Sequence, residues 1–275
     1  MNIILSGQPG VGKSTILKKV LILLENKNPH GCIVEEIREN SERIGFQMKY
    51  FPTGIPTLLA STRTVLSDHK VSKYFVNLKS IDEELVPFML EIKNKPKCGI
   101  VIFDEIGRMQ NLSKNFITAV DSIMNLSQPL IATIVYEDEP WTMKYKNDPK
   151  NFFIVATENN RDFIPNIIKL IVNADDLYNK LSINECKMII CLFNKYIKNN
   201  QLHEIKKLFE HAILYVAEKR YKVTSTGFEV IGNHGISTVT IRDEQYFCSC
   251  AFHAQNKREC SHIQTIKLTK NHLDL

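Results

Sequence analysis

Hydrophobic residues in the first 175 positions alternate between short continuous runs and runs with helical spacing. Continuous apolar runs at residues 2–6 and 99–103 are typical of buried strands, whereas residues 15–25 place their apolar side chains three and four positions apart, as an amphipathic helix does. The same patterns predict strands at residues 32–38, 44–51, 130–136 and 152–156, and helices at residues 81–92 and 115–124. Strands that alternate with helices predict a three-layer α/β domain with a mainly parallel sheet.

The pattern changes after a polar joint at residues 173–176. Two amphipathic helices are predicted at residues 183–196 and 202–218, and short strands follow at residues 221–224, 227–231, 237–241 and 245–248. We therefore expect three parts: an α/β domain over residues 1–175, a helical connector over residues 176–220, and a small ββα-like module over residues 221–275.

The composition of the 275-residue chain is that of a globular protein, with 44% hydrophobic and 24% charged residues. The longest apolar runs, at residues 20–24 and 188–193, are far shorter than the roughly 20 residues that a membrane helix needs. No signal peptide is readable, because the first predicted strand leads directly into Gly7. We expect a cytoplasmic protein with no membrane partner.

A glycine-rich loop follows the first predicted strand. Residues 7–14 read Gly-Gln-Pro-Gly-Val-Gly-Lys-Ser and match G-x-x-x-x-G-K-[ST] at every fixed position, between a strand and a helix as that motif requires. Its backbone N–H groups would face nucleotide phosphates, Lys13 would reach the β- and γ-phosphates, and the Ser14 hydroxyl would bind Mg²⁺. The predicted nucleotide-binding residues are Gly7, Gln8, Pro9, Gly10, Val11, Gly12, Lys13, Ser14 and Thr15.

Two acidic residues end the buried strand at residues 99–103. Asp104 fits the second Mg²⁺ position, and Glu105 is placed to accept a proton from water near the γ-phosphate. Lys13 and Glu105 are therefore the predicted catalytic residues. The alternative for Glu105 is that it only caps the next turn. A P-loop kinase of small molecules is disfavoured, because it would not need a base for water.

The first 175 residues resemble the THEP-type, or cancer-related, nucleoside triphosphatase family. The most specific part is Asp-Glu-Ile-Gly at residues 104–107, followed by a basic residue and Met109. The resemblance also rests on the P-loop, on residues 36–38, 43–46, 59–60, 73–74 and 132–133, and on Asn-Arg-Asp at residues 160–162. It implies Mg²⁺-dependent hydrolysis of several nucleoside triphosphates to diphosphate and phosphate.

The chain departs from that family at four positions. The family usually has Pro at Gln8 and Thr at Ser14, changes that preserve the chemistry, and Gly at Ser72. It has Glu at Gln110, so this chain lacks a carboxylate beside the catalytic strand.

Two arginines are candidates for stabilising charge in the transition state. They are Arg108 and Arg161, which would act as an arginine supplied in cis does. The alternative for each is an ion pair or a surface position.

A cluster of cysteines lies near the C-terminus. Cys248, Cys250, Cys260 and His262 give the spacing C-x-C-x₉-C-x-H, and three thiols with one imidazole are the soft ligand set of a closed tetrahedral Zn²⁺ site. We expect one structural zinc ion, with His253 as a less favoured competing ligand. The remaining cysteines, Cys32, Cys98, Cys186 and Cys191, are predicted to be reduced thiols in apolar surroundings.

Residues 221–270 resemble the SWIM zinc finger, which implies binding of DNA or another protein. The chain has a net charge of +5, mostly after residue 175, which is only weak support for an anionic partner. The leading hypothesis is a nucleoside triphosphatase with a zinc module that binds DNA or protein. The alternative is a nucleotide-switched binding protein, whose slow hydrolysis times its engagement of that partner.

Overall fold

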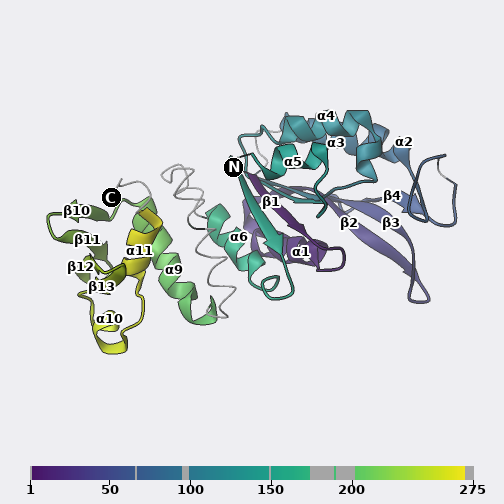
Figure 1. Cartoon of the computed structure of the whole chain (residues 1–275). Helices are drawn as coiled ribbons and strands as arrows, with labels where there is room; N and C mark the ends of the chain where they lie inside the picture. The colour runs from purple at the N-terminus through teal and green to yellow at the C-terminus, as the bar shows by residue number, and fades with distance from the viewer. Residues whose placement is uncertain are drawn as a thin grey trace. The chain divides into compact units, whose positions relative to one another are not determined.

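The computed structural model describes residues 2–65, 67–94, 99–148, 150–173, 189 and 202–269. The chain forms two compact units, Met1–Lys169 and Leu170–Leu275 (Figure 1). The predicted helix at residues 183–196 lies outside the described residues apart from Ile189, and so do Cys98, Cys186 and Cys191. The division into three parts therefore stays a prediction.

A nine-stranded sheet runs through the described part of the first unit. Its spatial order is β5 (Lys70–Val71), β6 (Tyr74–Val76), β4 (Pro56–Ser61), β3 (Glu42–Phe51), β2 (Pro29–Glu39), β7 (Ile100–Ile106), β8 (Leu130–Ile134), β1 (Asn2–Gly7) and β9 (Asn151–Ala156). Strands β2, β7, β8, β1 and β9 are parallel to one another. Strands β3, β4, β6 and β5 extend the sheet beyond β2 in antiparallel pairs. The sequence pattern predicted β1, β2, β3, β7, β8 and β9 but not β4 or the very short strands β5 and β6.

Helices cover both faces of this sheet. On one face lie α3 (Val86–Lys93) and α4 (Lys114–Ile123), and on the other lies α1 (Lys13–Leu23) (Figure 1). The Ser113 hydroxyl starts α4 by accepting a hydrogen bond from the Phe116 N–H. The other helices described before residue 174 are η1 (Glu25–Lys27), α2 (Leu78–Ser80), η2 (Ile81–Leu85), η3 (Gln110–Leu112), α5 (Pro140–Lys146) and α6 (Ile164–Asn173).

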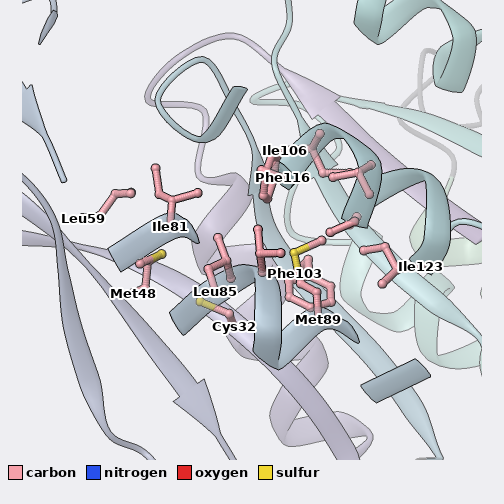
Figure 2. Packing of buried hydrophobic residues seen from close by; sticks show 14 of the residues in the cluster. Cys32, Met48, Leu59, Ile81, Leu85, Met89, Phe103, Ile106, Phe116 and Ile123 are labelled. Carbon is pink, nitrogen blue, oxygen red and sulfur yellow. The ribbon is translucent and has the colours of Figure 1, made fainter. Parts of the chain in front are cut away.

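The core of the first unit lies between the sheet and α3 and α4. Figure 2 shows Met89 of α3 and Phe116 of α4 packing towards Phe103 of β7. Cys32 of β2 belongs to this cluster and is 2% exposed, as predicted for a core thiol, and its burial raises its pKa. The sheet is thereby held rigid beneath the loops that leave its carboxyl ends.

The second unit contains a four-stranded antiparallel sheet and helices on one of its faces. The described elements are α9 (Leu202–Ala217), β10 (Tyr221–Thr224), β11 (Gly227–Gly232), β12 (Gly235–Arg242), β13 (Gln245–Cys248), α10 (Ala251–Asn256) and α11 (Ser261–Thr269). Two-residue turns join the strands, and Asp243 and Glu244 both have positive φ angles, as a tight hairpin turn requires.

Helix α9 is part of the core of this second unit. Its Tyr215 packs with Phe228, Val230 and Val239 of the sheet and with Ile263 of α11. The sequence pattern assigned residues 202–218 to a connector, because it could not show that the helix packs onto strands that follow it.

Candidate functional site

The P-loop joins β1 to α1 along the edge where the parallel strands end. A Cβ atom at Gly7 would lie 2.7 Å from the carbonyl oxygen of Ala156 in β9, so only glycine fits there. Gly12 has a φ of 102°, in the left-handed region that favours glycine, and its carbonyl accepts the Ile16 N–H at 2.9 Å. These two glycines let the chain turn sharply from strand to helix.

Lys13 lies across this loop. Its Nζ atom donates a hydrogen bond to the Gly7 carbonyl at 2.9 Å and is 3.9 Å from Oε2 of Glu105. The side chain is 11% exposed. The ammonium group is therefore fixed between the loop and the end of β7, where the sequence motif places the terminal phosphates of a nucleotide.

Asp104 is buried at the end of β7. The Thr133 hydroxyl of β8 donates to its Oδ1 atom at 2.5 Å, and Ser14 also lies against this carboxyl group. Desolvation raises the pKa of Asp104, and the two hydroxyls and the charge of Lys13 oppose that shift. Its Oδ2 atom has no hydrogen-bond partner among the described residues. A buried carboxylate oxygen facing a hydroxyl is a donor set that fits Mg²⁺.

Glu105 points into a cleft beside Asp104. Its side chain is one third exposed, yet the walls of the cleft desolvate it and raise its pKa. The Lys13 charge lowers that pKa, while Asp104 and Glu137 raise it. A carboxylate whose pKa lies above the ordinary glutamate value is a stronger base.

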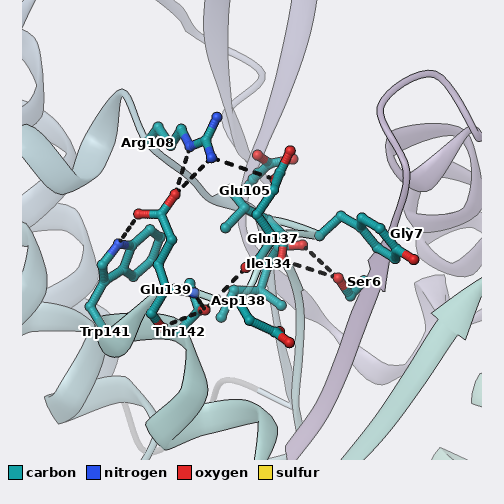
Figure 3. A network of polar contacts seen from close by, with 12 residues as sticks. Ser6, Gly7, Glu105, Arg108, Ile134, Glu137, Asp138, Glu139, Trp141 and Thr142 are labelled. Carbon is teal, nitrogen blue, oxygen red and sulfur yellow. Dashed lines mark hydrogen bonds and ion pairs between the residues drawn. The ribbon is translucent and has the colours of Figure 1, made fainter.

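Arg108 is held by an ion pair in this structure. Its Nε and Nη2 atoms both lie 2.8 Å from Oε1 of Glu139, and Nη2 lies 3.9 Å from Glu137 (Figure 3). Trp141 Nε1 donates to the other oxygen of Glu139 at 2.8 Å. This is the ion-pair alternative, although Arg108 still lines the same cleft as Glu105. Arg161 instead lies beside the P-loop, with Nη1 3.5 Å from the Val11 carbonyl.

Sequence reasoning missed two contributors to this site. Thr133 carried part of the family resemblance, but its contact with Asp104 depends on β8 lying next to β7. Glu139 was missed because it lies 31 residues from Arg108. Pro140, at the first position of α5, is the local signal for a helix start that could have drawn attention to it.

The second unit brings the four predicted zinc ligands together. Cys248 ends β13, Cys250 precedes α10, and Cys260 and His262 lie at the start of α11. Their ligand atoms all lie within 4.8 Å of one another. His253 is not part of this group, since its Nδ1 atom lies 2.7 Å from the Arg258 carbonyl.

The geometry of the group fits a tetrahedral ion. His262 Nδ1 lies 3.7 Å from Cys248 Sγ and 3.8 Å from Cys260 Sγ. Zinc bonds of about 2.0 Å to nitrogen and 2.3 Å to sulfur, at a tetrahedral angle, would separate these atoms by about 3.5 Å, close to the observed distances. The nitrogen that faces the thiols is therefore Nδ1.

The other side of the His262 ring is tightly enclosed. A Cβ atom at Gly232 would lie 2.3 Å from Nε2, so any larger residue at position 232 would collide with this ring. The Tyr215 ring stacks on the imidazole with 5.9 Å between centroids and 11° between planes. The Tyr215 hydroxyl accepts the Asn233 N–H at 3.2 Å and ties the helix α9 to the β11–β12 turn.

A P-loop at a strand-to-helix junction, a buried aspartate beside its serine and a glutamate facing the open cleft define a P-loop nucleoside triphosphatase. Comparison with known proteins supports that class. The family model described as NTPase matches residues 2–169. Nucleoside-triphosphatase THEP1 of Thermotoga sp. (strain RQ2) is 38% identical over 168 residues, which cover 61% of this chain and 93% of that protein. The chain therefore belongs to the THEP1-type nucleoside triphosphatase family.

Two solved structures support the fold. The crystal structure of THEP1 from Aquifex aeolicus matches with a TM-score of 0.54 and 33% identity, over 61% of this chain and 96% of that one. A human cancer-related nucleoside triphosphatase, solved in solution, has the same fold, with a TM-score of 0.50 and 24% identity over 61% of this chain and 95% of that one. The matching family model ends at residue 169 and does not reach the cysteine cluster. Within residues 2–173 and 202–269, as far as they are described, no helix is long and apolar enough to cross a membrane.

Proposed function

We propose that the P-loop residues Gly7 to Thr15 bind the phosphates of a nucleoside triphosphate and that water attacks the γ-phosphate beside Glu105. Lys13 neutralises charge on the β- and γ-phosphates, and Ser14 and Asp104 hold Mg²⁺. Glu105 takes the proton of the attacking water. The bound Mg²⁺ supplies further neutralisation of the charge that develops on the phosphate oxygens.

One observation carries this proposal: residues far apart in the sequence meet at one point. The Lys13 ammonium lies 3.9 Å from Glu105, and Ser14 lies against the buried carboxyl of Asp104, whose Oδ2 atom has no hydrogen-bond partner among the described residues. Arg161 is better placed than Arg108 to act on phosphate, because it already lies against the P-loop. Arg108 would first have to leave Glu139.

The test is phosphate release from ATP, GTP, CTP and UTP with and without Mg²⁺, for the parent and for Lys13→Ala. Lys13→Ala should abolish measurable hydrolysis and leave the fold intact, because it removes the charge that pairs with the phosphate oxygens. Lys19→Ala is the matched control, since this lysine of the same helix is half exposed and pairs with Asp162. A Lys13→Ala protein that hydrolyses ATP at the parent rate would make the site assignment wrong.

We also propose that Cys248, Cys250, Cys260 and His262 bind one structural zinc ion, and that the resulting module binds DNA or another protein. The support for zinc is the ligand set and its tetrahedral spacing. With all four positions taken by protein, no open position remains for a reacting water. A partner is supported by Phe247 and Phe252, which are 43% and 41% exposed on this small module.

A second candidate function is a nucleotide-switched binding protein. The observation that favours it is Gln110, which is buried beside the catalytic carboxylate: a Cβ at Gly107 would meet Gln110 Oε1 and Glu105 Oε1, each at 2.9 Å. A glutamate at position 110 would raise the pKa of Glu105 further and make it a stronger base, whereas the amide of Gln110 does not, which favours slow hydrolysis. Turnover measured with and without DNA separates the two functions, since only the switch predicts that the partner and the nucleotide state depend on each other.

A further inference from the structure

A cleft of about 390 Å³ opens beside Glu105, between the P-loop and the β2–β3 hairpin. It includes Pro9 and Ser14 of the P-loop and continues along Asp104. In the proposed function Ser14 and Asp104 hold Mg²⁺ and Glu105 faces the attacking oxygen. The cleft therefore lies at the γ-phosphate end of the nucleotide, on the side from which an in-line attack comes.

The γ-phosphate and Mg²⁺ would fill the part of the cleft beside Ser14 and Asp104, and the part towards the β2–β3 hairpin lies beyond them. One water occupies roughly 30 Å³ in the liquid, whereas sites for small molecules usually measure about 300–1,000 Å³. At about 390 Å³, the cleft has room for a small organic molecule with one of its groups beside Glu105.

The far wall of the cleft has the composition of a small-molecule site. Phe46, Leu59, Val71 and Tyr74 give it apolar and aromatic surface, and Arg43 is one of a few polar groups on it. An apolar wall with few, well-placed polar groups is typical of pockets that bind ring-bearing ligands.

Arg43 is held in a fixed position on that wall. Its Nε donates to the Tyr74 hydroxyl at 2.9 Å, its Nη1 donates to Glu36 at 2.7 Å, and its guanidinium carbon lies 5.1 Å from the centre of the Phe46 ring. The side chain is nevertheless 42% exposed. A guanidinium that is both fixed and accessible is a preorganised hydrogen-bond donor for a ligand.

The charges around the cleft favour a neutral ligand. The charge of Glu36 is balanced by the ion pairs with Arg38 and Arg43, which together leave one positive charge, and Arg108 lies between the carboxylates of Glu137 and Glu139, which leave one negative charge. The carboxylate of Glu105 and the triphosphate itself remain, and both would repel a second anion.

Resting on the proposed function of Glu105, we propose that this cleft binds a second substrate, a neutral, ring-bearing hydroxyl compound of the nucleoside class, whose hydroxyl takes the γ-phosphoryl group in place of water. The hydroxyl oxygen bonds to the γ-phosphorus, the bond from that phosphorus to the bridging oxygen of the diphosphate breaks, and Glu105 receives the hydroxyl proton. The products are a nucleoside diphosphate and a phosphorylated nucleoside. Glu105 can take a proton from water or from a hydroxyl group, so its presence does not exclude transfer to an acceptor. Hydrolysis is then the reaction that occurs when the cleft holds only water.

The experiment follows the label from ATP carrying a labelled γ-phosphate, with Mg²⁺ and adenosine, guanosine, cytidine or uridine. We expect labelled nucleoside monophosphate to exceed labelled phosphate with at least one nucleoside, because a bound hydroxyl is oriented and water is not. Label found only in inorganic phosphate with all four nucleosides would overturn the proposal. If the parent released no phosphate even without a nucleoside, the proposed hydrolysis itself would fail, which is a different result.

Two substitutions locate the second substrate. Arg43→Ala should raise the nucleoside concentration for half-maximal transfer by about 10- to 100-fold, the usual loss for a hydrogen bond to a charged group, and leave phosphate release without nucleoside unchanged. Arg38→Ala is the matched control, because Arg38 also pairs with Glu36 but does not line the cleft. Because Arg43→Ala leaves the buried Tyr74 hydroxyl unpaired, Val71→Phe, which fills the cleft, is the second variant. Transfer that is equal in the parent and in both variants would contradict the assignment.

Discussion

The absence of a side chain at Gly232, next to the His262 ring, gives a sharp test of the zinc site. In Gly232→Ala, the new Cβ would lie 2.3 Å from Nε2 of His262, whereas ordinary contacts begin near 3.4 Å. Gly232 does not have a positive φ, so alanine brings a steric contact and no backbone strain. The imidazole must therefore move by about 1 Å, several times the tolerance of roughly 0.2 Å for a metal–ligand distance.

Zinc affinity should fall by about 100-fold or more, because misplacing even an outer contact of a ligand costs about 10- to 100-fold. That loss is about 3 kcal/mol, a fraction of the roughly 10–16 kcal/mol with which structural zinc is held. The assay is competition with a chromophoric chelator, with Co²⁺ as a spectroscopic substitute that reports nitrogen ligation. Ile231→Ala is the control, since that neighbouring side chain is 51% exposed. Parent affinity in Gly232→Ala would mean that the β11–β12 hairpin moves instead of the imidazole, and the reasoning would be refuted.

Three further predictions concern the nucleotide site and the independence of the two units. Glu105→Gln should bind nucleotide as the parent does and hydrolyse it about 10²- to 10⁴-fold more slowly. The parent rate should fall as the pH drops through the raised pKa of Glu105, and the variant should not show this fall. Loss of nucleotide binding with unchanged hydrolysis per bound complex would make Glu105 structural. Asp104→Asn should raise the melting temperature of the nucleotide-free protein at neutral pH while abolishing Mg²⁺ binding. The pKa of Asp104 is higher in the folded protein than in the unfolded one, so the parent loses stability as the pH rises from the ordinary aspartate pKa through this raised pKa. The advantage of Asn should therefore vanish in acid. A calorimetric scan that shows a destabilised variant at neutral pH would contradict this. Cys250→Ser should release zinc and unfold the strands after residue 220 as seen by hydrogen exchange, and hydrolysis should stay near the parent rate; a collapse of hydrolysis would show that the two units are coupled.

Local motifs predicted the centre of each site, whereas contacts between distant segments had to come from the structure. The P-loop and the C-x-C-x₉-C-x-H spacing are local, because a loop and a metal each gather residues that are close in sequence. Thr133 meets Asp104 only through the order of the parallel strands. Tyr215 meets His262 because α9 and α11 pack together, although all four strands of the second sheet lie between these helices in the sequence. Strands β5 and β6 have only two and three residues, too few to show an alternating pattern, whereas β4 begins at Pro56 and buries its last three residues in a row instead of alternating.

The position of Tyr215 has a mechanical consequence. Coming from the nucleotide-binding residues, the chain enters the four-stranded sheet through α9, and Tyr215 of that helix lies directly against the imidazole of His262. Tension applied along the chain from the N-terminal side is therefore borne by α9 before it reaches any strand of this sheet. A pull that draws α9 away removes the aromatic support of one metal ligand and frees the Asn233 N–H at the same moment. A zinc ion bound by these four residues would therefore be loosened by a force on the chain, and not only by a chemical competitor.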